Sequence, residues 1–255
     1  MAPHLIMSAS YNALLAILLY ILDKKTAFSK TPYKAKQFII GVLFGLMAIF
    51  ATTALGGFDI GDGTIMNVRD AAPLCAGLIF GAPAGIIAGL IGGIYRFVAV
   101  YLGLAGTYTQ IACSVSTILA GFIAAILRKY MFDNKKPTWL YCIGIGMVTE
   151  VLHMLMIFFT NMDDAVNAFE FVKICTLPMV IGNGLAVGIA VLVVSLIGRE
   201  RLSSKKEQKQ ISQTFQSWLL ICIVIAFVAT SSFSSVLQTG MSEVQTNKTI
   251  ELSLS

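Results

Sequence analysis

Long apolar stretches, separated by short polar loops, follow one another along almost the whole chain. Eight of them are long enough to be considered as membrane spans, at 5–22, 38–56, 65–81, 84–101, 108–127, 138–160, 174–197 and 216–235. A helix needs about 20 mostly apolar residues to cross the hydrocarbon core of a bilayer. The pattern therefore predicts an all-α polytopic membrane protein with about eight transmembrane helices.

The apolar stretch at 73–101 can be interpreted as one span or as two. As a single helix it would be about 43 Å long, whereas the hydrocarbon core is about 30 Å thick. Gly81-Ala82-Pro83 interrupts it, and proline breaks the hydrogen-bond ladder of a helix. A division at this point also keeps every basic loop on the same side of the membrane. We therefore predict two short helices, 65–81 and 84–101.

The composition supports a membrane protein and excludes two other classes. Hydrophobic residues make up 57% of the chain and charged residues 12%, and the mean hydropathy is +0.82. Soluble domains carry about 25% charged residues, so a soluble enzyme is excluded. A disordered chain is excluded as well, because such chains are poor in apolar residues. The length of the runs favours helices over the short strands of a barrel.

The basic residues predict the orientation of the chain. Three loops, 23–37, 128–137 and 198–214, hold 14 of the 18 lysines and arginines. Such loops remain on the cytoplasmic side of a membrane. We therefore expect a multi-pass protein whose N-terminus lies outside.

No motif for catalysis stands out. The five cysteines lie inside apolar runs without the spacing of a zinc site or a disulfide framework. A P-loop, a dinucleotide fingerprint and a nucleophile elbow are all missing from the sequence. We expect no catalytic residue, no cofactor, no bound metal and no nucleic-acid partner.

Polar residues inside the predicted spans are the strongest pointer to a binding site. Ionisable groups in a membrane are costly, and they usually face a bundle interior or a water-filled cavity. Helix rise and orientation place nine side chains of interest in the outer half of the bilayer. These are Asn67, Arg69, Asp70, Arg96, Cys113, Ser116, Glu150, His153 and Asn183. Their shared depth predicts a polar pocket that opens outward.

The two arginines favour an anionic ligand, because a guanidinium can bind a carboxylate in bidentate fashion. Internal pairing is the alternative, with Arg69 or Arg96 neutralising Asp70 or Glu150. Glu150 and His153 lie one helical turn apart and can pair locally. A lone Glu-x-x-His is a weak metal motif, and a structural or pH-sensitive role is the simpler interpretation.

Glycines recur at 77, 81, 85, 89, 92 and 93. Small residues four apart allow helix backbones to approach closely in lipid. We therefore expect this series to serve helix packing and not phosphate binding.

Five sequence blocks resemble the LytS/YhcK-type transmembrane receptor domain. They are NVRD at 67–70, FGAPAG at 80–85, GIYR at 93–96, EVLHM at 150–154 and PMVIGNG at 178–184. That family supplies the sensory membrane modules of bacterial signalling proteins, whose outputs include histidine kinases, diguanylate cyclases and phosphatases. It is usually described with five spans, whereas the apolar pattern gives six over 38–197.

The resemblance also implies a ligand. Some members sense extracellular pyruvate through two arginines, a cysteine and a serine, which look like Arg69, Arg96, Cys113 and Ser116. The stretch between Arg96 and Cys113 is longer here than in those sensors. The domain is distantly similar as well to the six-helix substrate-binding subunits of energy-coupling-factor transporters. A vitamin or small-molecule transport subunit is therefore the alternative function.

The resemblance leads to a three-part division of the chain. Residues 1–37 are predicted as a leading helix and cytoplasmic loop, and 38–197 as the sensor domain in a bacterial cytoplasmic membrane. Residues 198–255 are predicted as a linker, a trailing helix and the start of an extracytoplasmic segment, so we expect a truncated chain. By analogy with kinases and cyclases we expect a homodimer.

Overall fold

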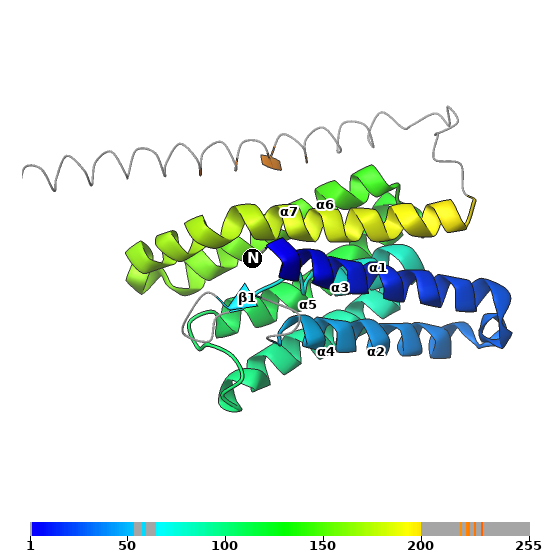
Figure 1. The fold of residues 1–255 in the computed structure, drawn as a ribbon, viewed down its shortest axis with the longest axis horizontal. Helices are drawn as coiled ribbons and strands as arrows, with labels where there is room; N and C mark the ends of the chain where they lie inside the picture. The colour runs from blue at the N-terminus through cyan, green and yellow to red at the C-terminus, as the bar shows by residue number, and fades with distance from the viewer. Residues whose placement is uncertain are drawn as a thin grey trace, which may run out of the picture.

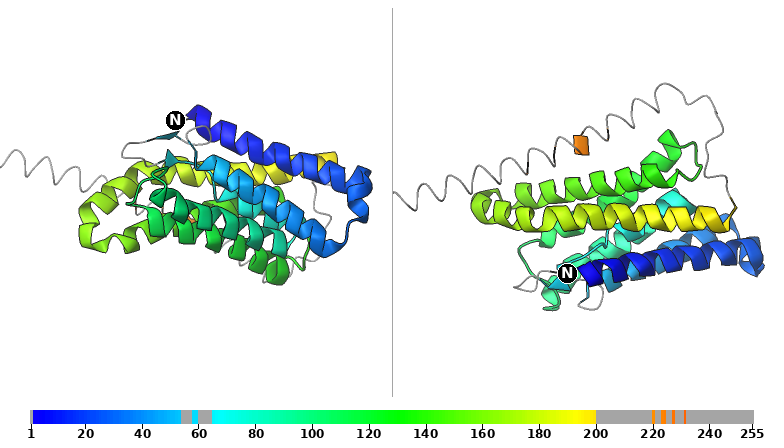
Figure 2. Two further views of the ribbon diagram at one scale, coloured as in Figure 1. Left: turned by 90° about the horizontal axis from the view of Figure 1, so that it is seen from below. Right: turned by 45° about the horizontal axis from the view of Figure 1, so that its top comes forward.

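The computed structural model is a bundle of long helices that lie side by side (Figure 1, Figure 2). It describes residues 2–53, 58–59 and 65–199, together with the single helical positions 220, 223, 224, 227 and 231. The predicted linker 198–214, trailing helix 216–235 and extracytoplasmic segment lie almost wholly outside the described residues. The helices of the described part are α1 (Ala2–Lys25), α2 (Tyr33–Ala51), α3 (Ala71–Cys75), α4 (Ala82–Tyr101), α5 (Gln110–Ile126), α6 (Trp139–Thr160) and α7 (Ala165–Ile197).

Short elements connect these helices. Single turns of 3-10 helix cover Ala27–Lys30 and Met162–Asp164, and π-helical turns at Ala76–Phe80 and Leu127–Met131 extend α3 and α5. Strands β1 (Phe58–Asp59) and β2 (Ile65–Met66) form one antiparallel pair of two residues each. The described part is therefore all-α apart from this pair.

Five helices of the described part are long and apolar enough to cross a membrane. They cover 33–51, 82–101, 110–131, 139–160 and 166–197. Each corresponds to a span predicted from the sequence. The predicted leading span 5–22 is also helical, as part of α1, but it is not among these five. The predicted total of eight spans is thus not confirmed, and the likeness to energy-coupling-factor subunits stays a prediction.

The predicted span 65–81 is corrected by the structure. Its helical part, Ala71–Phe80, has ten residues and is about 15 Å long, which is half of a hydrocarbon core. Residues 67–70 before it are not helical, because the Asn67 side chain accepts a hydrogen bond from the Arg69 backbone N–H. All residues from 66 to 79 are buried. Irregular backbone at membrane depth is tolerated where protein covers it.

The predicted break between the two short helices lies at Gly81, where φ is +154°. A side chain is strained at this angle, so glycine is favoured. The neighbouring α2 completes the break through Gln37, which donates to the Phe80 carbonyl (3.1 Å) and accepts from the Ala84 N–H (3.2 Å). Gln37 therefore satisfies backbone groups that lipid could not.

The glycine series packs α4 against α5 as predicted. A Cβ on Gly89 would lie 2.9 Å from the Thr117 carbonyl oxygen, and one on Gly93 would lie 2.6 Å from that of Ser114. From the other side, a Cβ on Gly121 would press into the Gly85 carbonyl oxygen. These contacts bring α5, with its polar residues, close to α4 and Arg96.

Gly121→Ala tests this packing. The added methyl group meets backbone that cannot move aside, so we expect a loss of about 1–3 kcal/mol in unfolding free energy. The matched control is Gly144→Ala in α6, where a Cβ meets nothing within 4 Å. Thermal unfolding in detergent should give a lower Tm for Gly121→Ala and an unchanged or higher Tm for the control. Equal Tm values for the two variants would contradict close packing of α4 on α5.

Candidate functional site

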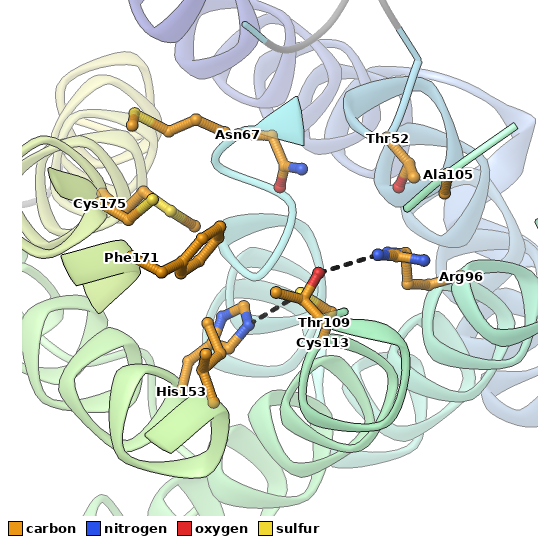
Figure 3. Close-up of a pocket in the computed structure, with 12 residues that line it drawn as sticks. Thr52, Asn67, Arg96, Ala105, Thr109, Cys113, His153, Phe171 and Cys175 are labelled. Atoms are coloured by element: carbon orange, nitrogen blue, oxygen red, sulfur yellow. Dashed lines mark hydrogen bonds between the residues drawn. The ribbon is translucent and has the colours of Figure 1, made fainter. Parts of the chain in front are cut away.

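A small pocket lies at one end of the bundle, where α2, α4 and α6 end and α5 and α7 begin (Figure 3). The cavity has a volume of about 20 Å³. The empty space around it, including open solvent at its mouth, is about 400 Å³. The polar wall consists of Thr52, Asn67, Arg96, Thr109, Cys113 and His153. The apolar wall includes Met66, Ile157, Phe171, Cys175 and Met179.

Arg96 presents an unpartnered donor at this pocket. Its Nη2 donates to the Gly106 carbonyl (3.0 Å) and to the Thr109 hydroxyl (3.0 Å). Its Nη1 is buried and has no hydrogen-bond partner among the described residues. Arg96 as a whole is 4% exposed. A buried cationic donor without an acceptor is costly, and an anion in the pocket would remove that cost.

Arg69 is engaged inside the protein. Its Nε donates to the Thr117 hydroxyl (2.7 Å) and lies 3.6 Å from Asp70 Oδ1, while its Nη2 donates to the Cys113 carbonyl (3.2 Å). Arg69 is 2% exposed and does not line the pocket. Internal pairing, the alternative left open by the sequence, therefore describes Arg69.

His153 lies between two carboxylates. Its Nδ1 is 3.0 Å from Asp70 Oδ2 and 3.2 Å from Glu150 Oε1, which confirms the predicted local pairing of Glu150 with His153. The Thr117 hydroxyl lies 2.6 Å from Asp70 Oδ1 and donates to it. A protonated imidazole in this position neutralises charge that would be costly in a buried site.

Asn183 joins α7 to the start of α3. Its Oδ1 accepts a hydrogen bond from the Ala71 N–H (3.0 Å), one of the backbone donors at a helix start that lack a partner in their own helix. Its Nδ2 donates to Glu150 Oε2 (2.7 Å) and to the Met179 carbonyl (3.1 Å). The polar network thus includes residues of α3, α5, α6 and α7.

Cys113 lies where this network meets the pocket. Its Sγ is 3.3 Å from His153 Nε2, and both side chains line the cavity (Figure 3). Cys75, Cys142 and Cys175 are buried, and all four cysteines of the described part are unpaired thiols.

Asp70, Glu150 and His153 could also hold a metal ion. Their donor atoms lie within 4.8 Å of one another, and divalent metals accept imidazole and carboxylate ligands. The same distances follow without a metal when His153 is protonated and pairs with both carboxylates. A metal-free site stays the prediction.

Eight of the nine predicted site residues fall into two groups, and Ser116 belongs to neither. Asn67, Arg96, Cys113 and His153 line the pocket, whereas Arg69, Asp70, Glu150 and Asn183 form the network behind it. Ser116 is buried, does not line the pocket, and has an Oγ without a partner among the described residues.

Thr109 and Thr117 also belong to the site, although neither was among the residues predicted from the sequence. Thr109 holds Arg96, and Thr117 connects Arg69 to Asp70. The spacing of residues 109, 113 and 117 was the available signal, because residues four apart share a helix face.

Thr117→Val tests the network. The change keeps the shape but removes a fully buried hydroxyl that accepts from Arg69 and donates to Asp70. We expect a loss of about 3 kcal/mol in unfolding free energy, since charged partners lose hydrogen bonds. The control is Thr176→Val, whose hydroxyl donates to the Val172 carbonyl in its own helix. A Tm of Thr117→Val equal to that of the control would show that the hydroxyl is dispensable.

Comparison with known proteins gives a family and relatives. The family described as 5TMR of 5TMR-LYT matches residues 20–197. The sensor histidine kinase YpdA of Escherichia coli (strain K12) is 30% identical over 205 residues, which are 78% of this chain and 34% of that protein. The sensor histidine kinase/phosphatase LytS of Staphylococcus aureus (strain Mu50) is 30% identical over 146 residues, which are 56% of this chain and 24% of that protein.

The similarity covers only part of the length of each relative. The chain spans about a third of the length of YpdA and a quarter of that of LytS. No solved structure matches the chain. The family match covers more than half of the chain and includes all five predicted blocks, so the chain belongs to the 5TMR-LYT family of transmembrane receptor domains.

Proposed function

We propose that the chain is the membrane sensor module of a bacterial signalling protein and that it binds a small extracellular carboxylate in the pocket. The family and the two kinase relatives support the signalling role. The observation that carries the ligand class is Arg96, which lines the pocket and whose buried Nη1 has no hydrogen-bond partner among the described residues. A carboxylate supplies the acceptor that this donor lacks.

The distribution of basic residues supports an outward-facing pocket. The pocket lies where α2, α4 and α6 end, and the basic loops 23–37 and 128–137 lie at the other end of the same helices. The positive-inside rule assigns these loops to the cytoplasm. The N-terminus of α1 then lies outside, in a bacterial cytoplasmic membrane.

The pocket walls favour a short ligand with an apolar end. Arg96 and Thr109 offer donors on one side, and Met66, Phe171 and Met179 offer apolar surface on the other. Pyruvate, a carboxylate with one methyl group, fits this division. In this proposal Arg96 and Cys113 contact the ligand, while Arg69 and Ser116 act from behind the pocket wall.

The network offers a route from pocket to output. Ligand binding at Cys113 and His153 changes the pairing of Asp70 and Glu150, and Asn183 passes the change to α7. Binding biases the output only if the ligand prefers one of two states. The output domain, which we place outside this chain, carries the enzymatic activity, and the module acts as a homodimer.

A thermal-shift titration with pyruvate and other short carboxylates tests the ligand class. A ligand that binds only the folded state raises the apparent stability. We expect a saturable rise in Tm for the wild type, its loss in Arg96→Gln, and its retention in Lys173→Gln. Lys173 is the matched control because it is a basic residue of α7, exposed and outside the pocket.

Two results would count against the proposal. An equal shift in Arg96→Gln would remove Arg96 from the ligand site. A shift with a vitamin-like compound, and none with any carboxylate, would favour the transport subunit.

A further inference from the structure

Cys113, His153 and the two carboxylates form an ordered series of contacts. The Cys113 Sγ lies 3.3 Å from Nε2 of the His153 ring, and Nδ1 of the same ring lies 3.0 Å from Asp70 Oδ2 and 3.2 Å from Glu150 Oε1. A nucleophile, a base within hydrogen-bond reach and a third group that fixes the base make up the arrangement of an activated thiol. Here the carboxylates lie at ion-pair distance from His153 Nδ1, and these contacts do not have hydrogen-bond geometry. A purely structural cysteine needs neither the base nor the carboxylates.

The thiol also faces the place where a ligand would lie. Cys113 and Arg96 line the same narrow pocket, and the buried Nη1 of Arg96 has no partner among the described residues (Figure 3). Arg69 adds a second positive charge close by, because its Nη2 donates to the backbone carbonyl of Cys113. Positive charge near a cysteine favours the reactive thiolate over the thiol.

We propose that Cys113 binds the pyruvate-like ligand of the proposed function covalently and reversibly, through the C2 carbonyl carbon of that ligand. With His153 protonated among the carboxylates, the Cys113 proton already lies on His153 Nε2 before the ligand arrives, and the Sγ lone pair of the thiolate attacks the C2 carbonyl carbon. The new S–C bond forms as the carbonyl π pair moves to the oxygen, which takes the proton back from His153. The product is a thiohemiketal, and no oxidant or second reactant is needed. Arg96 holds the neighbouring carboxylate during the addition.

This chemistry explains how so small a site could select its ligand. A 2-hydroxy acid such as lactate has nearly the same shape and the same carboxylate, but its C2 carbon is already tetrahedral and cannot accept the thiol. An additional covalent bond therefore discriminates between two acids that Arg96 alone would bind equally. The inference rests on the proposed carboxylate site and adds a reversible covalent bond to it.

The first experiment follows the C2 carbon of the ligand. The full chain in detergent is mixed with pyruvate labelled with ¹³C at C2, and the carbon spectrum is recorded. We expect a protein-dependent signal in the tetrahedral region that is lost in Cys113→Ala, a variant that leaves Asp70, Glu150 and His153 in place. Free pyruvate hydrate, present equally in both samples, is the internal reference.

The second experiment measures the thiol without any ligand. Iodoacetamide labelling, followed by peptide mass, compares Cys113 with Cys175, which lines the same pocket. We expect Cys113 to react about tenfold faster than Cys175, and His153→Gln to remove most of the difference, since thiolate fraction controls the rate. Equal rates in the wild type would overturn the inference.

The outcomes separate this inference from the proposed function. A pyruvate-induced Tm shift with C2 remaining trigonal, or equal shifts with pyruvate and lactate, would overturn the covalent step and leave the carboxylate receptor intact. Absence of binding by any carboxylate would overturn both. A tetrahedral C2 signal that requires Cys113 would establish the adduct.

Discussion

The structure depends on one constraint: a polar group inside a membrane must find its partner within the protein, because lipid offers none. The segment 66–79, which is buried at every residue, and the helix break that follows it concentrate this demand. Asn183 and Thr117 satisfy its polar start, and Gln37 satisfies the break at its end. The helices around it are therefore held by hydrogen bonds as well as by close glycine packing. Apolar contact alone provides little drive for association between helices in lipid.

The site divides its charged residues by function. Arg69 contacts acceptors on several sides within the bundle, whereas Arg96 lines the cavity and has one donor without a partner among the described residues. His153 belongs to both parts, with one ring nitrogen among the carboxylates and the other beside Cys113. The imidazole is thus the group through which an event in the pocket would reach the network. The family match and the kinase relatives identify the domain as a sensor domain, in which a connection from pocket to network is expected.

The sequence predicts much of this architecture. The remainder depends on contacts in space that the sequence pattern does not contain. Five spans, the break at Gly81 and the glycine contacts follow from length, proline chemistry and small-residue spacing. The span at 65–81 was predicted too long, because hydropathy does not register that Asn67 turns the backbone before α3. The separate tasks of Arg69 and Arg96 depend on which acceptors lie nearby in space. The four-residue spacing of 109, 113 and 117 predicts a shared helix face, but it does not predict that Thr109 meets Arg96 or that Thr117 meets Arg69 and Asp70.

The apolar wall of the pocket can vary more freely than the network. The side chains of Met66, Phe171 and Met179 line the ligand space, and Met179 contributes only its backbone carbonyl, which accepts from Asn183, to the network. Substitutions at these positions can reshape the cavity while the folded bundle persists. Under the proposed carboxylate role, variation at these positions is a route to a different choice of small acid. A change in the buried network, in contrast, leaves a charged or polar partner unsatisfied and costs stability.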